Sequence, residues 1–354
     1  MPFTKILASA ATGLTAGVAA FGVPLLDAEN AALPAPDATG WRADPVAGAL
    51  DPATATPALA AAFFANLTPA ERAGVVARFP VVVAALDGAP VTLRFAATAH
   101  LMRAQGHADL ATGRTFLAFD SVGDGRAIEV VGDLTTARRI VVIVPGNDTT
   151  LADFDRGLGG VTRRAPAAQA RAVHTAVSQA DPGSRTAVVA WLGYDSPEGF
   201  GKATIREDRA AAGAAALARF TDGLAVTNPG APVIVVGHSY GSVVLGRAAA
   251  SFGPNVTDLI AVASPGMGVG DASELRTTAR IWAARAESDW IGRIPDVRIL
   301  GLGHGEDPTD AGFGARILPA DGVDGHDGYL VAGSSTLAAV TQVILGGVPS
   351  GAAG

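Results

Sequence analysis

The sequence predicts an α/β fold in which helices cover both faces of a mostly parallel central sheet, preceded by an N-terminal helical extension. From residue 115 onward, strand-like runs alternate with Ala-rich helical stretches, which is the pattern of such a sheet. Of the 354 residues, 49% are hydrophobic and 17% charged, enough apolar material for a large core. Four runs are almost entirely apolar, as strands buried on both faces require: Ile140–Val144, Thr186–Trp191, Val233–Val236 and Leu259–Val262.

The remaining elements follow from turn signals and from the stretches between the strands. Thr115–Phe119 and Ala127–Val131 flank Gly123-Asp124-Gly125 and predict a hairpin. Two more short strands are expected at Ile281–Ala284 and Ala315–Leu318. The expected helices are Pro166–Gln179, Arg206–Gly223, Ser242–Ser251 and Thr336–Ile344.

The N-terminal third divides into three parts by composition. Residues 1–27 carry an uncharged stretch after Lys5 and are predicted to be a signal peptide, so the protein is expected to be secreted or held in the cell envelope. An ordinary N-terminal helix of a cytoplasmic protein is the alternative. Residues 28–56, rich in Ala, Pro and Asp, are predicted to be a linker. Residues 57–110 are predicted to be helical, with a capping box at Thr68-Pro69-Ala70-Glu71, and residues 111–348 to form the α/β domain.

Charge and composition exclude several classes of function. The net charge is −7 and no run of Lys or Arg occurs, so a nucleic-acid partner is not expected. The apolar stretch near the N-terminus is too rich in Ala and Gly for membrane integration to be expected. The chain has no cysteine, which excludes disulfides, thiolate nucleophiles and Cys-ligated metals. No cofactor or metal is predicted, because His304-Gly305-Glu306-Asp307 has no second histidine at helical spacing.

Gly237-His238-Ser239-Tyr240-Gly241 fits the G-x-S-x-G pattern of a nucleophile elbow. It follows an apolar run and precedes a small-residue helix, which is the strand–turn–helix setting that the elbow requires. Ser239 would occupy a strained turn that projects its hydroxyl above the sheet. Glycine is needed at Gly237 and Gly241 because a Cβ there would collide with a neighbouring strand or helix. A glycine-rich turn with a solvent-facing serine is the alternative.

A serine nucleophile needs a base, and six histidines are available. His326 is favoured, because it lies in a loop between the last predicted strand and the final helix; His304 is the rival. His238 is expected to point away from Ser239. The other three lie in predicted helical regions: His100, His107 and His174.

The acid of a triad should lie between the serine and the histidine in chain order. Asp289 is favoured because it closely follows the strand Ile281–Ala284. Three rival acids lie nearby in sequence: Glu287, Asp307 and Asp310. The oxyanion donors are expected to be the backbone N–H groups of Tyr240 and Asn147.

Several ordered segments together form a more specific pattern than the elbow alone. Among them are Leu67-Thr68-Pro69-Ala70-Glu71, Val144-Pro145-Gly146, Trp191-Leu192-Gly193-Tyr194-Asp195, Gly237-His238-Ser239-Tyr240-Gly241-Ser242 and Gly325-His326. With them, the chain resembles an uncharacterised α/β-hydrolase family common in actinobacteria, from about Leu67 to Leu345. The resemblance implies an α/β-hydrolase fold, a hydrolase, and the triad Ser239, Asp289 and His326.

The chain departs from the family pattern at two places. Where the family tends to read Pro-Gly-Met-Gly, this chain has Pro145-Gly146-Asn147-Asp148. The Asp148 carboxylate would repel an oxyanion if it pointed into the site. Where the family tends to read Asp-Pro-Ile-Gly, this chain has Asp289-Trp290-Ile291-Gly292, so the loop after the acid is expected to differ in shape.

These observations predict a serine hydrolase that acts on a small-molecule carboxylic ester or related acyl substrate. His326 would deprotonate Ser239, and water would then hydrolyse the resulting acyl-enzyme. An amidase or peptidase with the same triad is one alternative. A non-catalytic binding or envelope protein on the same fold is another. A working site requires His326 within hydrogen-bond reach of both Ser239 and Asp289.

Overall fold

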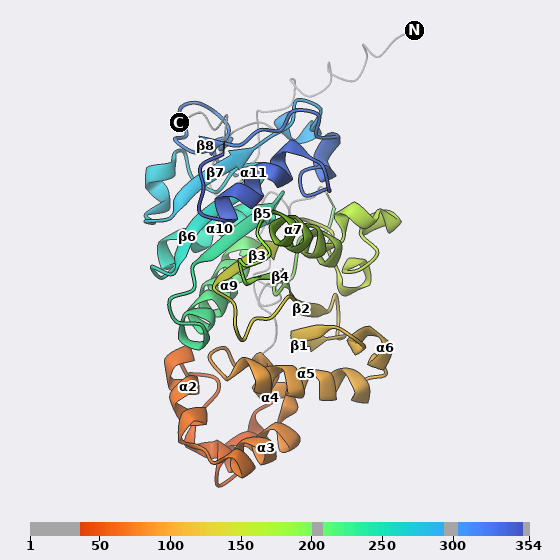
Figure 1. Ribbon diagram of the computed structural model, residues 1–354. Coiled ribbons are helices and arrows are strands. Elements are labelled where there is room, and N and C mark those ends of the chain that lie inside the picture. Colours follow the sequence, from red (N-terminus) through yellow and green to blue (C-terminus); the bar gives the residue numbers. More distant parts are fainter. Residues whose placement is uncertain (1–35, 200–207, 294–303, 350–354) are drawn as a thin grey trace, which may run out of the picture. The chain divides into compact units, whose positions relative to one another are not determined.

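The computed structural model describes residues 36–199, 208–293 and 304–349, which contain one eight-stranded sheet (Figure 1). In space the strands follow the order β1-β2-β4-β3-β5-β6-β7-β8. β1 pairs antiparallel with β2, and β2 with β4, whereas all the other pairs are parallel. The strands are β1 Thr115–Asp120, β2 Arg126–Val131, β3 Arg139–Val144, β4 Thr186–Leu192, β5 Val233–His238, β6 Val256–Val262, β7 Arg280–Ala284 and β8 Arg316–Ile317. The sheet is mostly parallel, as predicted.

Helices cover both faces of the sheet, which explains why its central strands are mostly apolar. α7 (Pro166–Ala180) and α11 (Ser335–Ile344) pack on one face. α9 (Asp208–Thr227) and α10 (Gly241–Ala248) pack on the other. The predicted start of α9, at residues 206 and 207, lies outside the described residues.

The region before the sheet is helical, as predicted, and packs on the sheet domain. It contains α2 Pro57–Asn66, α3 Pro69–Arg78, α4 Pro80–Ala85, α5 Val91–Ala104 and α6 Ala108–Ala111. The predicted capping box opens α3: Glu71 accepts from the Thr68 N–H at 2.8 Å, and Thr68 Oγ1 accepts from the Glu71 N–H at 3.3 Å. α5 lies against β1, and α2 lies against α9.

The structure differs from the linker expected at residues 28–56. The described part, from residue 36, contains two short helices, α1 (Thr39–Ala43) and η2 (Ala47–Ala49). Trp41 is fully buried between Phe63 and Phe79, and its indole N–H donates to the Leu50 carbonyl at 2.6 Å. The burial of Trp41 helps to dock this segment on the helices that follow, a contact that composition could not reveal.

All described residues belong to one compact unit, Ala31–Gly354. The boundary predicted between residues 110 and 111 falls inside α6, one residue before that helix ends. The signal peptide predicted at residues 1–27 lies outside the described residues and stays a prediction. Among the described helices, none has the length and apolarity that crossing a bilayer demands.

Candidate active site

Ser239 lies at the sharp turn between β5 and α10, in the setting that the elbow motif predicts. Its backbone has a φ of 54°, a left-handed conformation that non-glycine residues rarely adopt. Its N–H donates to the Val262 carbonyl at 3.0 Å, and its carbonyl accepts from the Ser242 N–H at 2.9 Å. A Cβ at Gly237 would lie 2.7 Å from the Gly241 carbonyl oxygen, and one at Gly241 would collide with the backbone of β3. Both glycines are therefore needed for the turn to form.

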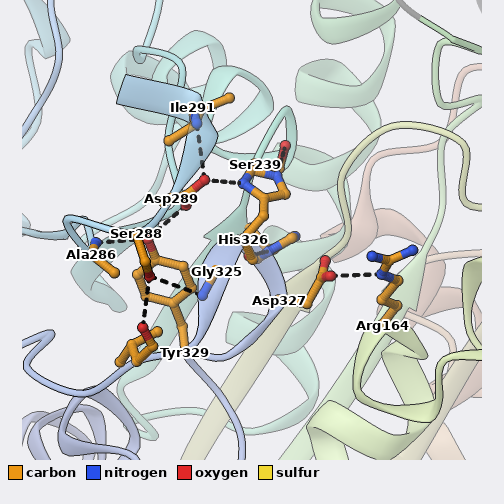
Figure 2. Close-up of polar contacts among 12 residues, drawn as sticks. Arg164, Ser239, Ala286, Ser288, Asp289, Ile291, Gly325, His326, Asp327 and Tyr329 are labelled. Carbon is orange, nitrogen blue, oxygen red and sulfur yellow. Dashed lines mark hydrogen bonds and ion pairs between the residues drawn. The ribbon is translucent and has the colours of Figure 1, made fainter. Parts of the chain in front are cut away.

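His326 lies between Ser239 and Asp289 (Figure 2). Its Nε2 is 3.0 Å from Ser239 Oγ, and its Nδ1 is 2.8 Å from Asp289 Oδ1. An ionised carboxylate can only accept, so Nδ1 carries the proton and Nε2 presents its lone pair to the serine hydroxyl. The structure brings these three predicted residues together, although they come from the β5–α10 turn, the loop after β7, and η9 (Gly325–Asp327).

Three donors surround the buried Asp289 carboxylate. Besides His326, the Ile291 N–H donates to Oδ1 at 2.9 Å, and the Tyr329 hydroxyl donates to Oδ2 at 2.7 Å. Burial raises the pKa of Asp289, but the hydrogen bonds from His326 and Tyr329 outweigh it and hold the pKa below its ordinary value. Asp289 is therefore ionised at neutral pH, as an acceptor for an imidazole N–H must be.

Tyr329 and Arg164 are two neighbours of the triad whose contacts sequence reasoning did not anticipate. The Tyr329 hydroxyl is fully buried, and it also accepts from the Ala286 N–H at 2.8 Å, so it joins the Asp289 carboxylate to the segment that follows β7. The Arg164 Nε donates to Asp327 Oδ2 at 2.6 Å, which ties the residue after His326 to η5 (Thr162–Arg164) (Figure 2). Neither contact leaves a signal in local sequence, because the partners are far apart along the chain.

His238 was expected to point away from Ser239, and this prediction is wrong. Its ring lines the same cavity as Ser239 and lies 5.0 Å from the His326 ring. Its Nε2 donates to the His326 carbonyl at 2.8 Å. Burial, together with the neighbouring His326, lowers the pKa of His238 to about 4, so the ring is neutral at neutral pH.

The loop after β3, where Asn147 is the predicted second oxyanion donor, is bonded to the segment after β4. The buried Tyr194 hydroxyl donates to the Pro145 carbonyl at 2.7 Å. The Ser196 hydroxyl accepts from the Thr149 N–H at 3.1 Å and donates to the Thr149 carbonyl at 3.0 Å. The Asp148 carboxylate, which was expected to repel an oxyanion if it pointed into the site, accepts from the Gly199 N–H at 2.6 Å.

A cavity of about 650 Å³ opens beside these residues. Its walls are residues 145–149, His238 and Ser239 of the elbow, and His326 and Asp327; Leu158, Arg164, Gln169 and Trp290 complete them. Asn147 lies in this wall, and Tyr240, the other predicted oxyanion donor, is buried at the start of α10. Among the described residues, no three His, Asp or Glu side chains gather as a metal site would require.

The rival residues lie in other environments. His304 is buried with its ring 5.5 Å from the Tyr240 ring. Glu287 and Asp310 are exposed, and Asp307 forms an ion pair with Arg285. Trp191 and Tyr194 are buried and stacked, with ring centroids 6.1 Å apart, so both belong to the core of the sheet domain.

The chain is similar in sequence to a known family and to several curated proteins. A sequence model of the alpha/beta hydrolase family matches residues 120–299, about half of the chain. The uncharacterized protein Rv2079 of Mycobacterium tuberculosis is 31% identical over 258 residues, covering 63% of this chain. The uncharacterized protein Mb0988c of Mycobacterium bovis is 31% identical over 169 residues, covering 46% of this chain and 62% of that protein. The chain spans only 37% of the length of the Mycobacterium tuberculosis relative.

Two solved structures are similar at low identity. A dienelactone hydrolase from Anabaena variabilis is 18% identical with a TM-score of 0.37, covering 64% of this chain and 92% of that one. A carboxylesterase from Mesorhizobium loti is 15% identical with a TM-score of 0.37, covering 65% of this chain and 98% of that one.

Proposed function

The chain belongs to the alpha/beta hydrolase family, and we propose that it is a serine hydrolase acting on carboxylic esters of small molecules. One observation carries the proposal. His326 is within hydrogen-bond distance of both Ser239 Oγ, at 3.0 Å, and Asp289 Oδ1, at 2.8 Å, at the wall of an open cavity. A nucleophile, a base and an acid that orients the base are the three parts that acyl transfer requires.

In the proposed reaction, His326 Nε2 takes the proton of Ser239 as Oγ attacks the ester carbonyl. The carbonyl oxygen becomes an oxyanion, which the N–H groups of Tyr240 and Asn147 are proposed to stabilise. Asp289 accepts the hydrogen bond of the imidazolium and stabilises its charge. His326 then passes the proton to the leaving alkoxide, and the acyl group stays on Ser239. Water activated by the same histidine attacks the acyl-enzyme and releases the acid.

Labelling with a fluorophosphonate probe tests the proposal directly. We expect one adduct by intact mass on the wild-type protein and none on Ser239→Ala. Pairs of a butyrate ester and a butyramide that carry the same group on oxygen and on nitrogen then separate esterase from amidase activity. Absence of an adduct on folded wild-type protein would contradict the proposal and favour a non-catalytic role for the fold.

A further inference from the structure

Trp290 is the one tryptophan of the four in the chain whose ring is substantially exposed. Its side chain is 37% exposed, whereas Trp41, Trp191 and Trp282 are at most 1% exposed. It opens η8 (Trp290–Arg293), directly after Asp289, and the next residue, Ile291, is buried with its N–H bonded to the Asp289 carboxylate. The backbone on both sides of Trp290 is therefore anchored.

The Trp290 ring lies beside the proposed base. The Trp290 and His326 ring centroids are 4.6 Å apart, with an angle of 39° between the ring planes. Both side chains line the cavity that contains Ser239. An exposed aromatic ring in a cavity wall offers apolar area, and a second ring can pack on it in an offset or edge-to-face arrangement.

The proposed reaction decides which part of an ester would lie there. His326 must pass its proton to the leaving alkoxide, so the alcohol portion has to lie on the histidine side of the tetrahedral intermediate. The carbonyl oxygen faces the backbone N–H donors instead. Because Trp290 adjoins His326, it borders the space for the alcohol portion.

We propose that Trp290 determines specificity by binding the alcohol portion of the substrate, and that the preferred substrates are esters of apolar alcohols such as benzyl esters. This inference rests on the proposed serine hydrolase function. Because benzyl and methyl butyrate give the same butyryl-enzyme, a preference between them arises in binding or acylation and not in deacylation.

The kinetic test compares butyrate esters that differ only in the alcohol. We expect wild-type kcat/KM to be at least tenfold higher for benzyl than for methyl butyrate. Trp290→Ala should lower kcat/KM for benzyl butyrate about tenfold and change that for methyl butyrate by less than about threefold. Trp290→Phe keeps a ring and should retain most of the preference. Leu158→Ala is the matched control, because Leu158 lines the same cavity and is 38% exposed, but as an aliphatic side chain it cannot form a ring-on-ring contact with His326.

A binding test does not require turnover. In Ser239→Ala protein, acrylamide should quench mainly Trp290, because the other tryptophans are buried. We expect benzyl butyrate to protect this fluorescence from quenching, and methyl butyrate at the same concentration to give little protection.

The outcomes separate the two proposals. Loss of fluorophosphonate labelling would contradict the hydrolase function itself. Two other results would contradict the role of Trp290 while an adduct on Ser239 still supports the hydrolase function. One is an equal loss of kcat/KM for both esters in folded Trp290→Ala; the other is equal protection from quenching by both esters.

Discussion

His238 donates its Nε2–H to the backbone carbonyl of His326 at 2.8 Å, so the residue before the serine supports the loop that carries the proposed base. A backbone carbonyl can only accept a hydrogen bond, so His238 must carry its proton on Nε2. The same ring lies 5.0 Å from the His326 ring. A charge on His238 would therefore repel the imidazolium that forms during catalysis.

Substituting His238 should separate these two effects. In His238→Gln the amide nitrogen can reach the position of Nε2 and donate to the same carbonyl, so we expect kcat/KM to stay within about threefold of wild type. His238→Leu leaves the carbonyl without its donor, which costs about 1–3 kcal/mol. The loop should shift, and kcat/KM should fall at least tenfold. Ester hydrolysis and thermal unfolding of both variants are the measurements; equal losses of activity in Gln and Leu would contradict the positioning role.

The pH dependence of stability should also report His238. Its pKa is about 4 in the folded protein against about 6.5 in an unfolded chain, so the unfolded state binds more protons between these values. Stability contributed by the neutral ring is complete above pH 6.5 and is lost as the pH falls towards 4, by about 3 kcal/mol. His238→Gln should lack this loss.

Urea unfolding of both proteins from pH 7 to 4.5 measures the difference. The difference is the quantity to follow, because Asp195 acts in the opposite direction. Burial, mainly, raises the pKa of Asp195 to about 6, so it gains protons in the folded state first. Parallel stability curves for wild type and His238→Gln would contradict the low pKa of His238.

Local patterns predicted the sheet well, and they failed where a buried polar residue interrupts a strand. The apolar run suggested Leu259–Val262, but β6 begins at Val256. Asp258 is buried in this strand because Arg280 donates to its carboxylate at 2.7 and 3.0 Å, and Trp282 donates at 2.7 Å. An apolar pattern cannot include a carboxylate whose partners come from the next strand.

The candidate site shows the same contrast between what a local pattern predicts and what distant partners determine. Chain order and strand position led to Ser239, Asp289 and His326, because each follows a recognisable strand or turn. The supporting contacts could not be found in this way. Arg164 and Asp327 are 163 residues apart, and their approach depends on the assembled fold.

Removing the Tyr329 hydroxyl should weaken catalysis through Asp289. Tyr329→Phe leaves the ring in its buried place but removes the donor to Asp289 Oδ2 and the acceptor for the Ala286 N–H. We expect a loss of stability of about 1–3 kcal/mol and a roughly tenfold fall in kcat, with KM little changed. Urea unfolding and steady-state kinetics check both parts. A kcat at the wild-type level would show that His326 and Ile291 suffice to hold the carboxylate.

Tyr194 should act on the opposite side of the site, through the loop that carries the proposed donor Asn147. Its hydroxyl is bonded to the Pro145 carbonyl, two residues before Asn147, so it fixes the start of the loop. Tyr194→Phe keeps the stacking on Trp191 and removes only this bond. If the Asn147 N–H stabilises the oxyanion, a looser loop should lower kcat by about tenfold and leave substrate binding nearly unchanged, because the donor matters most in the transition state.

A boronic acid that forms a tetrahedral adduct with Ser239 gives the complementary readout. Its affinity for Tyr194→Phe should fall by about the same factor as kcat, while a ground-state ligand such as the product alcohol binds as before. Ser196→Ala is the variant to compare with Tyr194→Phe. It also removes hydrogen bonds to this loop, but at Thr149, the far end of the loop. Equal weakening of the boronic acid and the alcohol would point to a general distortion of the cavity and against Asn147 as the second donor.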